Sequence, residues 1–128
     1  MTKFTRGGRL VPMDRLERWV TFSTLGDAEV VSLTGEIDLA NAPEIGRAIV
    51  ERIESAAKVL IDLTTVSFLD SAGVRLLDAL IGDLDKHGKP ARLVVGETGA
   101  ARMTLQLCAF REDVLATDLD RAAAELKG

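Results

Sequence analysis

A short and almost wholly apolar run, KVLIDL at residues 58–63, sets the strongest constraint on what this chain can fold into. A strand without a polar face must be covered on both sides, as the inner strands of a parallel sheet are. The segments around this run have helical spacing. Ile45, Ile49 and Ile53 recur every four residues before it, and residues 71–86 continue an apolar stripe after it. Alternating strands and helices of this kind predict an α/β fold.

The remaining segments complete that order. Gly26-Asp27 is a turn signal between two β-rich stretches, and so short a turn predicts an antiparallel hairpin. The expected strands are 16–25, 28–34, 58–63, 92–95 and a brief edge strand at 112–115; the helices start at Pro43 and cover 71–86, 100–108 and 117–126; and 35–42 and 64–70 are loops. The order ββαβαβα(β)α predicts a mixed sheet with an N-terminal antiparallel hairpin, parallel inner strands and about four helices.

The chain of 128 residues has the length of one domain. Its charge is uneven, because residues 1–18 carry a net +3 and the rest a net −7. We therefore expect a flexible basic segment at residues 1–14 and the domain at residues 15–128.

The composition excludes several functions. A net charge of −4 and an aromatic content of 4% do not suit direct nucleic-acid binding. No apolar run approaches the roughly 18 residues that span a bilayer, and no signal peptide is present, so a cytoplasmic protein without membrane insertion is expected.

Catalysis has little support in the residues. The chain lacks the glycine-rich phosphate-binding motifs, and one cysteine and one histidine cannot form a His/Cys metal cluster, so no cofactor is expected. His87 lies in a Gly/Pro turn and is expected to be solvated there. It is too far along the predicted helix from Ser71 to form a catalytic triad. Cys108 lies in an apolar stretch and is expected to be a small core residue.

The segment at 67–74 (SFLDSAGV) follows the buried strand and opens a helix. Binding sites gather at the carboxyl ends of parallel strands. Asp70 or Ser71 could simply cap the helix. Alternatively, Ser71 is a phosphorylation site, since a hydroxyl at a helix N-terminus is accessible and the helix dipole favours an added phosphate. Asp70 would repel that phosphate, which would leave the new charge displayed to a partner.

A second polar segment, at 35–43 (GEIDLANAP), precedes the first helix. In one interpretation it is a loop in which Asp38 or Asn41 caps that helix. If strand 28–34 lies beside strand 58–63, the same loop emerges near Ser71 and adds acidic groups to a serine-centred surface.

Together these two segments make the chain resemble the STAS domain family, and within it the bacterial anti-sigma factor antagonists. The resemblance rests on VVSLTGEIDLANAP at 30–43 and LIDLTTVSFLDSAGV at 60–74, and it extends more weakly over 16–126. It implies a regulatory binding module without enzymatic activity, acting as a monomer or weak dimer.

The resemblance also implies a switch. The dephosphorylated protein would bind an anti-sigma factor that is also a serine kinase, and a sigma factor would be released. The kinase would use its own ATP to phosphorylate Ser71, which breaks the complex, and a PP2C-type phosphatase would reset it. Asp70 matches the acid before the serine, and Asp38 matches the acid of the family's Gly-Glu-Leu-Asp loop.

This chain departs from the family motif after the serine. Close relatives often have Asp-Ser-Ser-Gly-Leu-Gly, whereas this chain has Ala72, which leaves one acceptor hydroxyl, and Arg75 in place of a small residue. Arg75 would restrict the approach of a partner, pair with an acidic group of it, or remain a solvated charge. The expected partner-binding residues are Asp38, Asp70, Ser71, Ala72, Gly73 and Arg75, followed by Asn41 and Glu36.

Other functions remain open on the sequence. The chain could be a non-catalytic STAS docking subunit of an ABC-type membrane transporter or of a stress-signalling assembly. A response-regulator receiver has a suitable size, with Asp62 as the acceptor, but the early acid pair and the late lysine of a receiver are missing.

Overall fold

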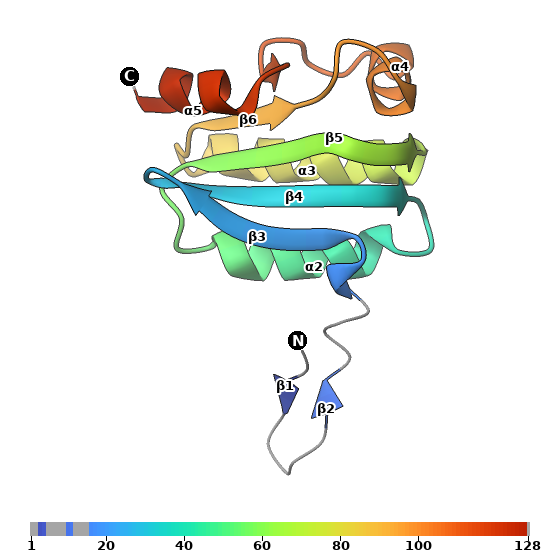
Figure 1. Cartoon of the computed structure of the whole chain (residues 1–128), viewed down its shortest axis with the longest axis horizontal. Helices are drawn as coiled ribbons and strands as arrows, with labels where there is room; N and C mark the ends of the chain where they lie inside the picture. Colours follow the sequence, from blue (N-terminus) through green and yellow to red (C-terminus); the bar gives the residue numbers. More distant parts are fainter. Residues whose placement is uncertain (1–2, 5–9, 12–15, 128) are drawn as a thin grey trace.

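A five-stranded mixed sheet forms the centre of the protein (Figure 1). The computed structural model describes residues 3–4, 10–11 and 16–127. The sheet order is β3-β4-β5-β6-β7, with β3 antiparallel to β4 and the other neighbours parallel. The strands are β3 (Val20–Leu25), β4 (Ala28–Ile37), β5 (Val59–Leu69), β6 (Ala91–Val94) and β7 (Leu115–Ala116); β1 (Lys3–Phe4) and β2 (Leu10–Val11) form a separate antiparallel pair.

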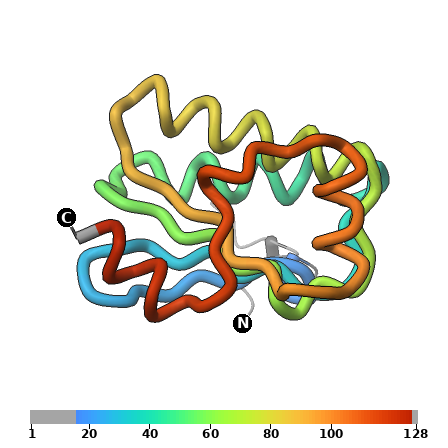
Figure 2. Tube along the Cα trace, turned by 90° about the horizontal axis from the view of Figure 1, so that it is seen from above, coloured from blue at the N-terminus to red at the C-terminus, as the bar shows by residue number. Residues whose placement is uncertain are grey.

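Helices cover the sheet on both faces (Figure 2). They are α2 (Ala42–Ile53), α3 (Ser71–Lys86), α4 (Ala100–Leu107) and α5 (Leu119–Lys127). Because side chains alternate along a strand, neighbours such as Leu60 and Ile61 enter different cores. Ile61 belongs to the larger cluster with α2, α3 and α4, whereas Leu60 packs with α5. The predicted order ββαβαβα(β)α is confirmed.

Helix α3 begins at Ser71 and ends at Lys86, as the sequence predicts. Its end is set by Gly88, whose φ of +66° is a left-handed conformation that glycine adopts without strain. His87 is exposed in this turn, as expected.

Two strands are longer than the sequence predicts. Residues 64–69, expected as a loop, continue β5, and β4 continues to Ile37 instead of ending at Thr34. Register shifts between these two strands interrupt the alternation of apolar and polar residues, so the pattern does not look like a strand. Val66 and Leu69 are nevertheless buried, which favours the extended pairing.

Strands β3 and β7 start later than the sequence predicts. Leu16 lies in a helical turn, so β3 starts only at Val20. The edge strand β7 lies at Leu115–Ala116, so it starts three residues later and ends one residue later than expected.

Cys108 is exposed, and the expectation of a core cysteine is wrong. Helix α4 ends at Leu107, and Ala109 then adopts a φ of +54°. The chain therefore turns sharply, and Phe110 rather than Cys108 enters the core beside Leu105.

The predicted basic segment 1–14 lies mostly outside the described residues, so its flexibility and the domain boundary stay predictions. Over the described residues, no helix is long and apolar enough to cross a membrane.

Candidate functional site

Strands β4 and β5 end side by side, so the chain segments that follow them meet. Ile37 pairs with Leu69 at the last position of the two strands. The backbone N–H of Asp70 donates to the carbonyl of Ile37 at 3.2 Å. The expected proximity of the 35–43 segment to Ser71 is therefore confirmed, and this edge of the sheet is the candidate site.

Asp70 ties the two segments together through its carboxylate. Oδ1 accepts from the N–H of Gly73 at 3.0 Å and caps α3, as the sequence predicts. Oδ2 accepts from the N–H of Leu39 at 3.1 Å, in the loop between β4 and α2. One side chain thus fixes the start of α3 and the position of the neighbouring loop.

Gly73 makes that close approach sterically allowed. A Cβ at this position would lie 2.5 Å from Leu69 Cδ1 and 3.2 Å from the carbonyl oxygen of Ile37. The second neighbour is backbone and cannot rotate away. Gly73 and Ala72 are both buried, so their role is to shape the site.

The loop between β4 and α2 is held by its own polar side chains. Asp38 Oδ1 accepts from the N–H of Ala40 at 2.9 Å. Asn41, which is buried, accepts from the N–H of Asp38 at 2.9 Å and donates to the carbonyl of Glu36 at 2.8 Å. Of the two residues expected to cap α2, Asp38 closes the turn into the helix, since its Oδ1 also accepts from the N–H of Asn41 at 3.3 Å. Asn41 itself makes no cap bond through its side chain, contrary to expectation. The amide of Asn41 instead closes the end of β4.

Three charged or hydroxylated side chains of the site have no intramolecular partner among the described residues. Ser71 lies exposed at the start of α3, Arg75 lies exposed one turn further along it, and Glu36 is exposed at the end of β4. Within the described part of the chain, no hydrogen bond or ion pair involves the Oγ of Ser71, the guanidinium of Arg75 or the carboxylate of Glu36. Glu36 and Asp38 line a small hollow beside Trp19.

The single histidine of the chain lies far from the site. His87 follows the last residue of α3, and its Nδ1 lies 2.8 Å from the carbonyl oxygen of Asp83. The 16 residues of α3 separate it from Ser71 by about 24 Å, at a rise of ~1.5 Å per residue. Among the residues that the structure describes, no cluster of histidine, cysteine and acidic side chains could hold a metal ion.

A groove between α2 and α3 opens next to Ser71, and the sequence motifs do not predict it. It encloses about 790 Å³. Two of its apolar side chains are strongly exposed, Leu39 at 69% and Val50 at 49%. Val50 lies outside the Ile45, Ile49 and Ile53 stripe, and this apolar residue on the outer face of an amphipathic helix was the available signal.

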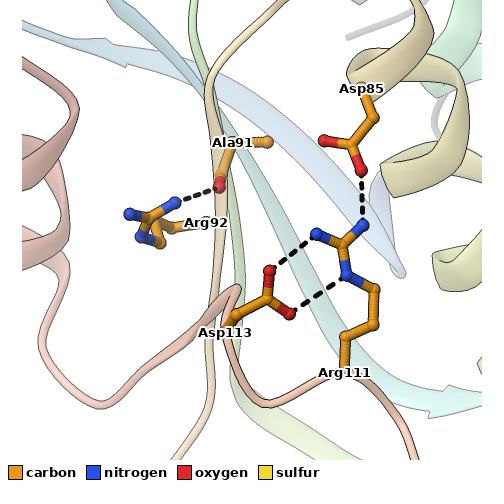
Figure 3. Close-up of polar contacts among 5 residues, drawn as sticks. All are labelled: Asp85, Ala91, Arg92, Arg111 and Asp113. Atoms are coloured by element: carbon orange, nitrogen blue, oxygen red, sulfur yellow. Dashed lines mark hydrogen bonds and ion pairs between the residues drawn. The ribbon is translucent and has the colours of Figure 1, made fainter.

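A second polar cluster lies at the other end of α3 (Figure 3). Arg111 binds Asp113 through Nε at 3.1 Å and Nη2 at 2.7 Å, and its Nη1 donates to Asp85 in the last turn of α3. The hydrogen bonds from Arg111 lower the pKa of the Asp113 carboxyl, and both acids raise the pKa of Arg111. The cluster pins the segment after α4 to α3.

The chain is similar in sequence to known proteins. A profile of the family described as STAS domain matches residues 20–124. The anti-sigma-F factor antagonist RsfB of Mycobacterium tuberculosis is 38% identical over 77 residues, covering 57% of this chain and 63% of that protein. The chain thus spans less than two thirds of the length of this curated relative.

Solved structures agree with the profile. An anti-sigma factor antagonist from Mycobacterium paratuberculosis superimposes with a TM-score of 0.74 at 29% identity, over 85% of this chain and 93% of that one. The anti-sigma factor antagonist SpoIIAA in its unphosphorylated form gives 0.67 at 18% identity, over 83% and 93% of the two chains, which is a likeness of fold.

Proposed function

The chain belongs to the STAS domain family, and we propose that it acts in the cytoplasm as an anti-sigma factor antagonist. With Ser71 unmodified, it binds an anti-sigma factor that is also a serine kinase, and a sigma factor is released. The chain contributes binding and no catalysis of its own.

Phosphorylation of Ser71 ends this interaction. The kinase's ATP supplies the γ-phosphoryl group: a bond forms between Ser71 Oγ and the γ-phosphorus, ADP leaves, and the hydroxyl proton passes to the kinase. A PP2C-type phosphatase hydrolyses the phosphoserine and restores binding.

The observation that carries the proposal is the state of the Ser71 hydroxyl. It is exposed, it forms no hydrogen bond within the described residues, and it stands on a framework fixed by Asp70 and Gly73. A kinase can therefore reach the hydroxyl without unfolding the segment that carries it.

The local charges explain why a phosphate would act on the partner. It adds about −1.5 to −2 charges. Asp70, beside it, already accepts two backbone N–H bonds, and its negative charge opposes a fold-back of the phosphate onto the capping position. The new charge stays at the surface, where repulsion and desolvation oppose the complex.

The expected interface residues take different roles in this proposal. Ser71, Arg75, Glu36 and the part-exposed Asp38 would face the partner. The remaining residues shape the surface from below: Asp70, Ala72, Gly73 and Asn41.

Affinity capture from the organism's own lysate tests the function. Wild type and Ser71→Ala should retain a protein identified by mass spectrometry as an ATP-dependent serine kinase, and Ser71→Asp should not. Incubating the isolated kinase with ATP should add one phosphate to wild type and none to Ser71→Ala.

Ser55→Asp is the matched control, because Ser55 is exposed in the turn after α2, at the opposite edge of the sheet. It should capture the kinase like wild type. Recovery of transporter subunits without phosphorylation of Ser71 would favour a docking subunit instead and refute the proposal.

A further inference from the structure

The groove between α2 and α3 has the dimensions of a helix-binding site. Both helices begin at the edge where β4 and β5 end, and they run back along the sheet in parallel (Figure 1). Helix α2 has 12 residues, which correspond to a groove about 18 Å long at ~1.5 Å per residue. Recognition of an amphipathic helix in an apolar groove needs a few apolar anchors over such a length.

Gly46 leaves room for Leu76 in this groove. A Cβ on Gly46 would lie 2.7 Å from Leu76 Cδ1, the far end of a flexible side chain, so a larger residue at position 46 would make the Leu76 side chain shift. Leu76, Ala79 and Val50 complete an apolar lining that starts at Leu39, directly beside the site.

The charges along the groove are separated by sign. Arg47 and Arg75 line the half next to Ser71, whereas Glu51, Glu54 and Asp83 line the far half. The N-terminal ends of both helices add partial positive charge at the Ser71 end, and their C-terminal ends add partial negative charge at the other.

These side chains are also unused inside the protein. Over the described residues, Arg47, Arg75 and Glu51 form no ion pair or hydrogen bond through their side chains. Two other arginines do pair, Arg111 with Asp113 and the half-buried Arg92 with Glu125, whereas the exposed guanidinium of Arg121 also forms no such contact over the described residues.

We propose that this groove binds one amphipathic helix of a protein partner, with acidic residues at the end that lies next to Ser71 and basic residues at the far end. The apolar stripe of that helix contacts Val50, Leu76 and Ala79. Its acidic end pairs with Arg47 and Arg75, which gives a function to the arginine that departs from the family motif. The inference rests on the proposed function only in naming the anti-sigma factor as the protein that supplies the helix.

Two synthetic peptides test the groove without any kinase. Both are stapled helices of about 12 residues with leucines at i, i+3, i+4 and i+7 and identical composition. One carries its glutamates at one end and its lysines at the other, and in the second peptide the charges are mixed. The separated peptide should bind about tenfold more tightly, since several exposed ion pairs contribute a small amount each. Fluorescence anisotropy measures both affinities.

The orientation of the bound peptide in the groove is measured by nuclear magnetic resonance. A spin label at the acidic end of the separated peptide should broaden the amide signal of Ala72 and spare that of Glu54. Val50→Glu should abolish binding of both peptides, whereas Leu107→Glu, at an 81% exposed apolar position on α4, should not. Arg47→Glu combined with Arg75→Glu should remove the preference for separated charges.

Equal affinities of the two peptides, no binding of either, or broadening at Glu54 would each overturn the inference. So would self-association of the protein that Val50→Glu abolishes, since a second copy would then occupy the groove. Failure of these peptides would leave the Ser71 switch standing. Failure of the Ser71 variants to change kinase capture would refute the switch while leaving the groove intact.

Discussion

The two ends of α3 use their charges in opposite ways. At its N-terminal end, Ser71 and Arg75 are exposed and form no interactions within the described residues. Beyond its C-terminal end, Arg111 joins Asp85 to Asp113 (Figure 3), and Lys89 Nζ donates to the carbonyl of Glu54 at 2.7 Å. The charged side chains beyond the C-terminal end are bonded within the protein, whereas the side chains of Ser71 and Arg75 are exposed to solvent.

This difference distinguishes a binding surface from a structural contact. A residue whose polar atoms are already satisfied gives up those bonds if it is to serve a partner, and breaking them costs free energy. Exposed groups without an intramolecular bond can bind a partner without breaking one. We therefore call the two regions the open end and the closed end of α3. We expect changes to the exposed side chains of the open end to act on binding, and changes to the paired charges of the closed end to act on stability.

The largest expected effect is on binding at the open end. Ser71→Asp should weaken the affinity for the kinase by more than a hundredfold, about 3 kcal/mol, because added negative charge repels the partner. Isothermal titration with the captured kinase measures it. Asp113→Asn, at the closed end, should leave that affinity unchanged. A similar loss for both variants would contradict the division.

The second-largest expected effect is on stability, and it differs between two glycines of α3. Gly73→Ala should destabilise the fold by about 1 kcal/mol, because overpacking of ~2 kcal/mol against Ile37 exceeds the gain in helix propensity. Gly82→Ala, where a Cβ meets no atom within 4 Å, should instead stabilise it by about 0.5–1 kcal/mol. Urea denaturation compares them. A stabilising Gly73→Ala would show that the framework of the open end is looser than described.

Loss of the Asp70 carboxylate should lower the free energy of unfolding by a similar amount. Asp70→Ala removes the cap of α3 and the bond to Leu39, and a lost cap costs about 1 kcal/mol. Hydrogen exchange at the Leu39 amide should accelerate in this variant. Asp78→Ala, at an exposed position in the middle of α3, serves as the control: it should not lower the stability, and it should leave the exchange of the Leu39 amide unchanged. Unchanged exchange in Asp70→Ala would contradict the bridging role.

The smallest expected effect is a pH dependence at the closed end. Arg111 lowers the pKa of the Asp113 carboxyl from its ordinary value of 3.8, so the folded protein binds this proton less tightly than the unfolded chain. The resulting stabilisation is present at neutral pH and is lost as the pH falls through the folded-state pKa. Urea midpoints of wild type and Asp113→Asn should therefore differ near neutrality and converge in acid, and salt should reduce the difference. A difference that persists in acid would contradict the ion pair as its source.

Local signals explain what the sequence predicts well. The start of α3 at Ser71 follows from a capping acid and an apolar stripe, and its end follows from Gly88. The two motifs that meet at the site were also identified, because parallel strands carry the segments after them to one edge. No local pattern indicates that Asn41 is buried, with its amide bonded to the backbone of Glu36 and Asp38, and its part in partner binding stays a prediction.

The order of elements, the family resemblance and the serine that we propose as the phosphorylation site can be predicted from the sequence, since each depends on neighbours a few residues away. The tertiary structure is needed to show which polar groups are satisfied internally and where the outer faces of two helices form a groove. The bond from Leu39 to Asp70 spans 31 positions, and that from Arg111 to Asp85 spans 26. Such contacts depend on packing geometry between distant segments, which no local pattern encodes.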